Sequence, residues 1–362
     1  MGVRALFQTC VFSIAFSQSS LAQATVSSHM FRENPAHLIT PHETDKSVYD
    51  TRSWQFYAEA PVRSSVLVFG NSVYFGTTGG KFFSVDRTTG NKKWEKDIGS
   101  PVNSSAAIDN GKIFFVDNTQ SVYAIDPANG KTKWKVALGQ KLEYPWRFDY
   151  YYSSPVPYLG RIYLGADDGF LYSIDQNTGQ VKWKYDCKSI IRSTPAIRNN
   201  RIYFGDMNGT FHALDLSGTK ELWNFKTVGD TLKNEEWGFD RKAILSSPVI
   251  TQGKIVFGCR DGFLYCLSEE TGGELWKMNH NVSWVISTVA VKDSIVVTGT
   301  SDGRFVQAIN INSGREMWKF RTPLVVWSSP IIVGEHVYGA SVLHVLVCYW
   351  LKLYKFVESS AE

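Results

Sequence analysis

Short runs of alternating apolar and polar residues recur along this chain and predict β-strands throughout its length. Residues 170–175 (FLYSID) alternate in this way, and residues 181–185 (VKWKY) do so again, with Trp183 and Tyr185 on one face. The intervening Gln-Asn-Thr-Gly predicts a tight turn, because Asn and Thr side chains cap backbone groups and Gly179 can adopt a positive φ. The stretch therefore predicts a β-hairpin.

This hairpin belongs to a repeating unit whose copies each end in a tryptophan. The six copies end at Trp94, Trp134, Trp183, Trp223, Trp276 and Trp318, at intervals of 40, 49, 40, 53 and 42 residues. In five copies a glycine stands four residues before the tryptophan, and the fourth copy has Gly218 instead. An upstream strand such as Ile162–Gly165 leads into the hairpin through a turn of the Asp168-Gly169 kind. Each unit therefore predicts at least three strands.

A pair of hydroxyl residues marks the start of a further strand in each unit. Seven such starts occur, at Ser64-Ser65, Ser104-Ser105, Ser153-Ser154, Ser193-Thr194, Ser246-Ser247, Ser287-Thr288 and Ser328-Ser329. Four strands with a period near forty residues are typical of a β-propeller, whose blades must stack in a ring to bury both faces. The chain is thus predicted to be all-β, with seven four-stranded blades, or eight as the alternative.

The tryptophans are offset along the chain from the hydroxyl pairs, and this offset predicts how the ring of blades closes. Trp54 precedes the first start, and no matching tryptophan unit follows the start at Ser328. We therefore expect residues 53–56 to be the outermost strand of the last blade, so that the two ends of the chain pair in one sheet. After Tyr338 the sequence leaves the template, which indicates either a divergent pair of strands in blade seven or a slipped reading frame.

The chain of 362 residues divides into a leader, an arm, a propeller and a tail. Residues 1–24 combine Arg4, an apolar run and the small-residue pattern Ala22-Gln-Ala24, which predicts a signal peptide and a mature protein beginning at Thr25. A buried N-terminal strand is the alternative. Residues 25–52 form a polar N-terminal arm, residues 53–357 the propeller and residues 358–362 the tail. The protein is predicted to be exported, periplasmic or secreted, with no transmembrane span.

Charge and short motifs narrow the function further. The formal net charge is +4, with Lys and Arg scattered through turns, so nucleic acid is not an expected partner. His29, His37 and His42 have no metal-binding spacing and are expected to be solvated. Residues 299–303 match a nucleophile elbow but fall on a hairpin turn, and Asp175 begins a turn that only resembles a calcium loop. No catalytic residues, cofactor site or metal site are predicted.

Two long links predict where a partner binds. Residues 139–152 and 228–244 both join an outermost strand to the next innermost strand, and strand alternation places them on the face of the Asp-Gly turns. Their aromatic and guanidinium side chains repeat in no other unit, and such residues carry binding energy at protein interfaces. The candidate partner-binding face comprises Trp146, Arg147, Tyr150, Trp237, Trp284 and Trp327. The alternative is that these loops only cap the axis and pack on each other.

The repeat D-G-x-L-Y-x-(I/L)-D-x-x-T-G-x-x-x-W, the Ser-Ser-Pro starts and the arm residues 31–37 (FRENPAH) resemble the pyrroloquinoline-quinone-like (PQQ-like) propeller repeat family. That family includes outer-membrane assembly factors of the BamB type and quinoprotein dehydrogenases. The resemblance implies a non-catalytic scaffold that binds a protein or peptide, with envelope proteins as candidate partners. We expect this scaffold to be a monomer. The alternative it implies is a PQQ-dependent dehydrogenase with calcium, although the chain lacks the adjacent cysteines found in those enzymes.

Overall fold

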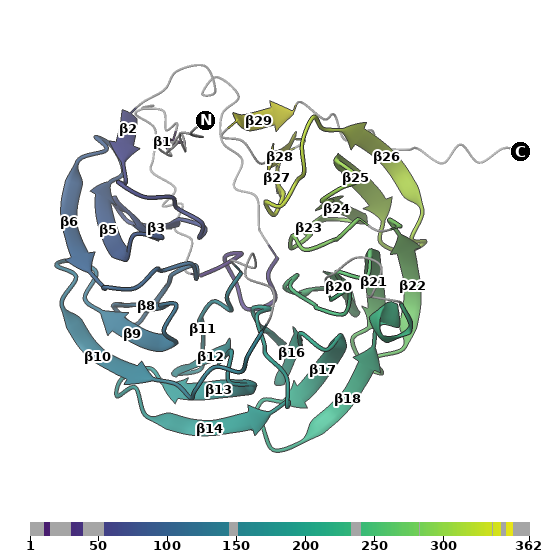
Figure 1. Cartoon of the computed structure of the whole chain (residues 1–362), viewed down its shortest axis with the longest axis horizontal. Coiled ribbons are helices and arrows are strands. Elements are labelled where there is room, and N and C mark those ends of the chain that lie inside the picture. The colour runs from purple at the N-terminus through teal and green to yellow at the C-terminus, as the bar shows by residue number, and fades with distance from the viewer. Residues whose placement is uncertain are drawn as a thin grey trace, which may run out of the picture.

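In the computed structural model, seven β-sheets are arranged radially around a central axis (Figure 1). The structure describes residues 11–14, 30–38, 54–144, 151–232, 240–281, 283–334, 336–341 and 345–349. Six sheets have four antiparallel strands and the seventh has three. The prediction of an all-β propeller with seven blades is confirmed.

Blades one to four follow one another in sequence, each running from its innermost to its outermost strand. Blade one comprises β3 (Leu67–Phe69), β4 (Ser72–Gly76), β5 (Lys81–Asp86) and β6 (Lys92–Asp97). Blade two comprises β7 (Ala107–Asp109), β8 (Lys112–Val116), β9 (Ser121–Ile125) and β10 (Thr132–Ala137). Blade three comprises β11 (Val156–Tyr158), β12 (Arg161–Gly165), β13 (Phe170–Asp175) and β14 (Val181–Asp186). Blade four comprises β15 (Ala196–Arg198), β16 (Arg201–Gly205), β17 (Thr210–Asp215) and β18 (Glu221–Lys226).

Blades five to seven continue the order after a short 3₁₀ helix, η2 (Val228–Thr231). Blade five comprises β19 (Val249–Thr251), β20 (Lys254–Gly258), β21 (Phe263–Ser268) and β22 (Glu274–Asn279). Blade six comprises β23 (Ala290–Lys292), β24 (Ile295–Gly299), β25 (Phe305–Asn310) and β26 (Glu316–Arg321). Blade seven comprises β27 (Ile331–Val333), β28 (His336–Ser341) and β29 (Val345–Tyr349). In all seven blades one residue separates the hydroxyl pair from the innermost strand, so the pairs precede these strands rather than beginning them.

Trp54 and the tryptophans that end the first five units each pack on the turn glycine of the following blade. Such contacts join Trp54 to Gly90, Trp94 to Gly130, Trp134 to Gly179, Trp183 to Gly218, Trp223 to Gly272 and Trp276 to Gly314. All six glycines have a positive φ, and a Cβ at any of them would lie closer than 3.0 Å to the indole ring. The shifted glycine of the fourth copy, Gly218, therefore has the same role as the others.

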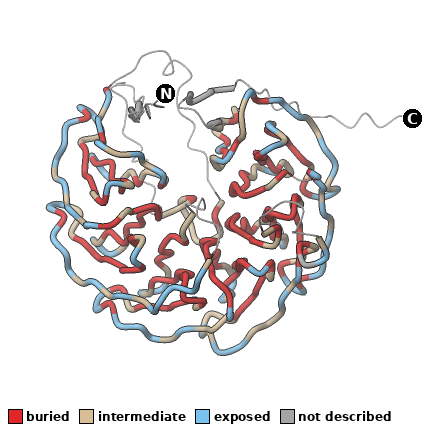
Figure 2. Tube along the Cα trace, viewed as in Figure 1, coloured by how far each residue is buried: buried red, intermediate tan, exposed pale blue. Residues whose placement is uncertain are grey.

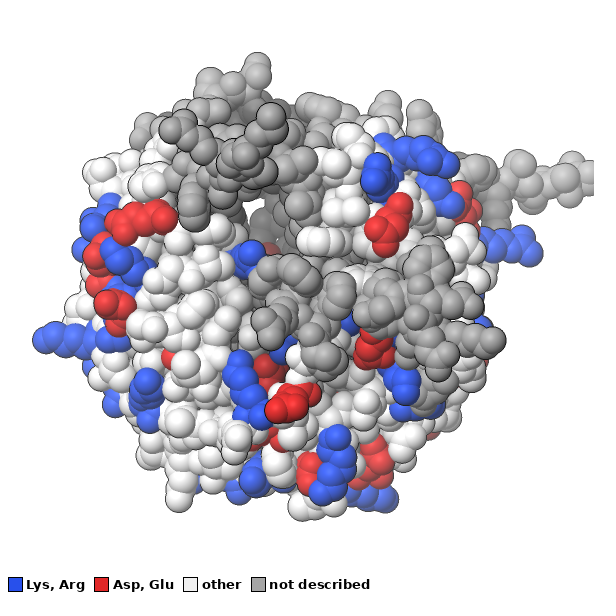
Figure 3. Space-filling view, in the orientation of Figure 1, with Lys and Arg blue, Asp and Glu red and all other residues white. Residues whose placement is uncertain are grey.

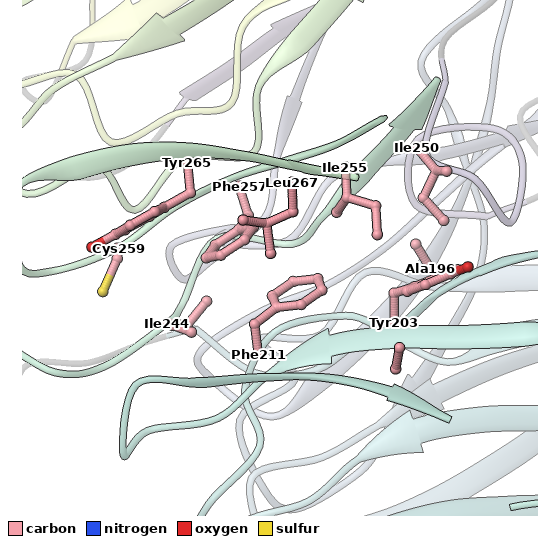
Figure 4. Close-up of a cluster of buried hydrophobic side chains, with 11 residues drawn as sticks. Ala196, Tyr203, Phe211, Ile244, Ile250, Ile255, Phe257, Cys259, Tyr265 and Leu267 are labelled. Carbon is pink, nitrogen blue, oxygen red and sulfur yellow. The ribbon is translucent and has the colours of Figure 1, made fainter. Parts of the chain in front are cut away.

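Apolar side chains fill the spaces between the blades, whereas the outer strands are exposed on their outward positions (Figure 2). Between blades four and five, the rings of Phe211 and Phe257 stack with their centroids 4.2 Å apart. Tyr203 and Tyr265, also fully buried, belong to the same cluster (Figure 4). Each sheet therefore stays buried only while its neighbours are in place.

The second hydroxyl residue of each pair forms a belt of hydrogen bonds around the axis. The backbone N–H of Ser65 donates to Ser105 Oγ at 3.0 Å, and the same bond repeats from blade to blade. The belt continues through Ser154, Thr194, Ser247, Thr288 and Ser329, at distances of 2.9 to 3.2 Å. The hydroxyl pairs thus join neighbouring blades at the axis, a role that the sequence pattern did not reveal.

The prediction that the two ends of the chain pair in one sheet is wrong for the described residues. β2 (Trp54–Tyr57) pairs with β1 (Val11–Ile14), while β29 pairs with β28. Backbone N–H and C=O groups are the same in every strand, so the repeat predicts that residues 54–57 form a strand but not which strand pairs with it. The division into leader, arm, propeller and tail remains a prediction, and residues 358–362 lie outside the described part.

The arm residues 30–38 lie against the inner strands and hold several blades together. The N–H of Ile197 donates to the carbonyl of Pro35 at 2.6 Å, and the N–H of Ile250 donates to that of Ala36 at 3.1 Å. The Arg32 guanidinium donates to the carbonyls of Thr288 and Pro330, at 2.6 and 2.7 Å. The arm therefore joins blades four, five, six and seven from inside the ring.

His37 is buried, at 1% exposure, so the expectation that it is solvated is wrong. Its Nδ1 lies 2.7 Å from the carbonyl oxygen of Pro248, and its Nε2 has no partner among the described residues. Burial lowers the pKa of His37 to about 4, although the Pro248 carbonyl raises it. A second proton would leave a buried N–H at Nε2 without an acceptor.

This burial predicts a specific loss of stability in acid. The pKa of His37 is lower in the folded chain than the usual value of 6.5. Below pH 6.5 the unfolded chain therefore binds a proton that the folded chain binds only near pH 4, and the folded state becomes less stable. Because of this group, the free energy of unfolding should fall by about 2 kcal/mol between pH 7 and pH 5. Urea unfolding should show a smaller difference between these two pH values for His37→Asn than for the wild-type chain, whereas equal differences would contradict the assignment.

Candidate functional site

The links that enter the innermost strands and the turns after the second strands lie together at one end of the axis. In blade four the N–H of Met207 donates to the carbonyl of Ile190 at 2.9 Å. In blade six the N–H of Ser301 donates to the carbonyl of Trp284 at 3.1 Å. We call the surface formed there by Tyr144, Tyr151, Arg192, Arg260, Trp284 and Trp327 the axial mouth.

An apolar cluster lies beneath the axial mouth. Its buried members come from the entry segments of blades four to six and from one turn, and they are Ile190, Met207, Ala243, Leu245 and Ile286. Tyr144, Tyr151 and Trp284 pack against this cluster and are partly buried. The two tyrosines precede blade three in sequence, yet their side chains pack against residues that belong to blades four, five and six.

Arg260 organises the side of the mouth formed by blades five and six. It is completely buried, and its guanidinium lies 4.6 Å from the centre of the Trp284 ring. Its Nη1 donates to the Tyr144 hydroxyl at 2.6 Å. A desolvated guanidinium over an indole ring is a favourable cation–π contact. Trp284 is therefore a packed residue that supports the mouth rather than a fully exposed docking residue.

Arg192 organises the opposite side through a buried ion pair. Its Nε and Nη2 each donate to a different oxygen of Asp167, both at 3.0 Å. Its guanidinium also lies 5.2 Å from the centre of the Tyr144 ring and 5.1 Å from that of Tyr152. Two parallel hydrogen bonds fix the orientation of both groups. Tyr144 is thus held between two arginines from different blades.

Trp327 provides the exposed apolar surface of the mouth, at 38% exposure. The Tyr151 hydroxyl donates to its backbone carbonyl at 3.0 Å, which connects the link before blade three to the entry of blade seven. Of the predicted face, Trp284 and Trp327 thus lie near the same axial end, while Trp146, Arg147, Tyr150 and Trp237 lie outside the described residues. Tyr144 and Tyr151 place both flanks of the first link at this mouth.

Tyr144, Arg192 and Arg260 are not among the residues predicted from the sequence. A signal for the axial positions was nevertheless present, because the residue before each hydroxyl pair varies although its surroundings repeat. These residues are Arg63, Asn103, Tyr152, Arg192, Leu245, Ile286 and Trp327. Positions that vary within a constant framework are where a propeller carries its specific surface.

The carboxylates near this end are engaged within the protein. Asp206 accepts hydrogen bonds from the N–H groups of Asn208 and Thr210 and lies 3.3 Å from His212 Nε2. Asp261 accepts from the Tyr265 hydroxyl at 2.7 Å, and burial raises its pKa. Burial lowers the pKa of His212, but its hydrogen bonds with Asp206 and Glu221 raise it more. Within the described ranges, no three His, Cys, Asp or Glu side chains are grouped so that they could hold a metal ion.

The charges on the outer strands are largely paired. Lys93, Lys133 and Lys182 each contact the aspartate that begins the turn of the same blade, at 3.5, 2.9 and 3.6 Å. Figure 3 shows Lys and Arg beside Asp and Glu around the perimeter of the face in view. In the described part of the chain, no helix has the length and apolar character needed to cross a membrane.

Comparison with known proteins assigns the chain to a family. The model of the family described as outer membrane protein assembly factor BamB matches residues 47–144, 145–236 and 230–342. The chain belongs to this family. BamB of Escherichia coli strain K12 is 31% identical over 120 residues, which are 33% of this chain and 27% of that protein. The chain therefore matches only about a quarter of the length of this relative.

Other relatives show that the repeat also occurs in enzymes. Quinohemoprotein alcohol dehydrogenase ADH-IIG of Pseudomonas putida is 26% identical over 136 residues, covering 34% of this chain and 19% of the enzyme. Among solved structures, BamB from Moraxella catarrhalis superposes with a TM-score of 0.69 at 17% identity, covering 81% of this chain and 86% of that one. At this identity the superposition supports the fold alone.

Proposed function

We propose that this chain is an exported, non-catalytic scaffold, periplasmic or secreted and monomeric, that binds a protein or peptide partner at the axial mouth. The observation that supports the proposal most directly is that contacts from different blades hold the side chains of this mouth in place. Tyr144 is held by Arg192 and Arg260, and Tyr151 is held by the carbonyl of Trp327. A surface fixed in this way loses little conformational freedom when a partner binds.

The residue types at the mouth also support protein binding. Trp, Tyr and Arg dominate the binding energy of protein interfaces. Here the exposed ring of Trp327 lies beside polar groups that already have partners, so a partner can cover the apolar surface without stripping those groups of their hydrogen bonds. The family description, outer membrane protein assembly factor, favours an envelope protein as the partner.

The second candidate function is that of a quinone-dependent dehydrogenase, favoured by the likeness to the Pseudomonas putida enzyme. The described residues do not fit PQQ with calcium. Asp167 is paired with Arg192, Asp261 accepts from Tyr265, and the Arg260 guanidinium covers a face of the Trp284 ring. Titration with PQQ and calcium, followed by ultraviolet-visible spectroscopy, separates the two functions. The scaffold function predicts no stoichiometric uptake, and tight uptake of one quinone per chain would favour the enzyme.

The scaffold proposal predicts a selective loss of binding. Replacing Trp146, Trp237 and Trp327 together by Ala should reduce capture of envelope proteins by the immobilised chain at least about tenfold, as truncation of interface tryptophans commonly costs 2 kcal/mol or more. Leu159→Ala is the matched control, because Leu159 is 71% exposed in the turn between β11 and β12, at the other end of its blade. Both variants should melt close to the wild type. Equal capture by the triple variant and the wild type would contradict the proposal.

A further inference from the structure

A groove of about 330 Å³ lies between blades three and four, at the end of the ring opposite the axial mouth. It is formed by the turn between β11 and β12, by β12 and β14, and by the turn between β17 and β18. Both turns lie opposite the Asp-Gly turns, because successive strands run in opposite directions. The lining residues are Leu159, Arg161, Tyr163, Trp183, Leu216 and Ser217. A groove of this size can hold a small ligand or the end of a peptide.

Leu159 occupies a backbone position that disfavours it. The first residue of the turn between the first two strands has a positive φ in all seven blades, from 46° to 57°. In blade three this residue is Leu159, with a φ of 47° and 71% exposure. The other six blades have glycine or a polar residue there, namely Gly70, Asn110, Asn199, Gln252, Asp293 and Gly334. A left-handed backbone disfavours a residue with a Cβ, and exposure gives the leucine no burial in return, so the turn alone does not explain it.

The turn of blade four that lines this groove closes one residue earlier than its counterparts. The N–H of Gly218 donates to the carbonyl of Asp215, three residues back, at 3.0 Å. In blades one, two, three, five and six the turn glycine donates to the residue four positions back, as Gly179 does to Asp175. The backbone of the blade-four turn therefore follows a different path.

Elsewhere in the ring, carbonyl groups of this turn accept hydrogen bonds from the preceding blade. The carbonyl of Gln176 in blade three accepts from Trp134 Nε1 at 3.0 Å. The carbonyl of Glu269 in blade five accepts from Arg201 Nη1 at 3.3 Å and from the Tyr203 hydroxyl at 3.4 Å. The turn thus supplies acceptors to the donor side chains that face it.

The equivalent donors of blade three have no such acceptor. They are Arg161, Tyr163 and Trp183, and within the described part of the chain none of them donates to residues 215–220. The Arg161 guanidinium has one long hydrogen bond, from Nη1 to Ser173 Oγ at 3.5 Å. The groove therefore combines apolar walls with donors that blade four does not satisfy.

The residues that line the groove include no carboxylate. Asp175 stands opposite Arg161 in the neighbouring strand, but it accepts hydrogen bonds within its own turn and contacts Lys182 at 3.6 Å. Asp215 accepts from the Ser217 hydroxyl at 2.8 Å, again within its own turn. A carboxylate from a ligand is thus the group that complements Arg161 and the neighbouring donors.

We propose that this groove binds the carboxyl-terminal residue of a peptide whose last side chain is apolar. The carboxylate accepts from the Arg161 guanidinium and replaces the carbonyl acceptors that the blade-four turn withholds. The apolar side chain packs against Leu159 and Leu216, which explains a leucine in a left-handed turn. In a carboxyl-terminal residue both groups are attached to one carbon, so a single small groove can bind them together. The site is separate from the axial mouth and does not depend on the function proposed for it.

The indole N–H of Trp183 reports binding directly in the full chain. Nuclear magnetic resonance spectra of protein labelled on the indole nitrogens are recorded during titration with acetyl-Gly-Gly-Leu, with its carboxyl-terminal amide and with octanoate. The Trp183 signal is assigned with Trp183→Phe. The acid peptide should shift this signal to saturation, and the amide should bind at least about tenfold more weakly, because it lacks the charge-assisted hydrogen bonds. Equal affinities for acid and amide, or tighter binding of octanoate than of the peptide, would overturn the proposal.

Two variants test the charge and the apolar wall separately. Arg161→Gln should weaken binding of the acid peptide at least about tenfold and leave the amide unchanged. Arg201→Gln is the matched control, since that guanidinium already donates to carbonyls of blade five. Leu159→Asn introduces the residue found at this position in blades two and four, so it should melt no lower than the wild type and still bind the peptide more weakly. Capture at the axial mouth should be the same in all three. Unchanged peptide binding by Arg161→Gln or by Leu159→Asn would contradict the assignment.

Discussion

The contact between the outer-strand tryptophan of one blade and the turn glycine of the next is the constraint on which this ring depends. The indole ring occupies the space that a Cβ would need, and the glycine supplies the positive φ that the turn requires. Because each contact joins two blades, a blade is fixed only when its neighbour is folded. The apolar clusters between sheets and the belt of Ser and Thr hydroxyls repeat the same dependence closer to the axis.

This framework explains why the residues at the axial mouth can differ from blade to blade. Packing between blades is provided by the repeated positions, so the residue before each hydroxyl pair is free to be Arg192 in one blade and Trp327 in another. The non-repeating residues then interact across the axis rather than within their own blades. A mouth that is specific in chemistry can thereby be built on a framework that is almost uniform.

Much of the fold could be predicted from the sequence, because the period, the turn glycines and the tryptophans are local signals. The register of the hairpin that ends at Trp183 follows from such a signal. The role of His37 could not be predicted, since its burial depends on an arm that crosses the inner strands of blades far away in sequence. The partner of β2 was missed because hydrogen bonds between backbones carry no sequence label, and Arg260 was missed because its contacts come from two other links.

Two glycines of blade five test the central constraint most directly. Gly272 and Gly253 have nearly the same φ, +73° and +71°, but a Cβ at Gly272 would collide with Trp223, whereas nothing lies within 4 Å of one at Gly253. Backbone strain is therefore matched in Gly272→Ala and Gly253→Ala, and only the first disturbs the contact between blades. Denaturant unfolding should show that Gly272→Ala lowers the free energy of unfolding by at least about 1 kcal/mol more than Gly253→Ala does. This is the size of loss expected when an extra methyl group is forced into a well-packed site. Equal losses would show that the tryptophan-on-glycine contact does not hold the ring together.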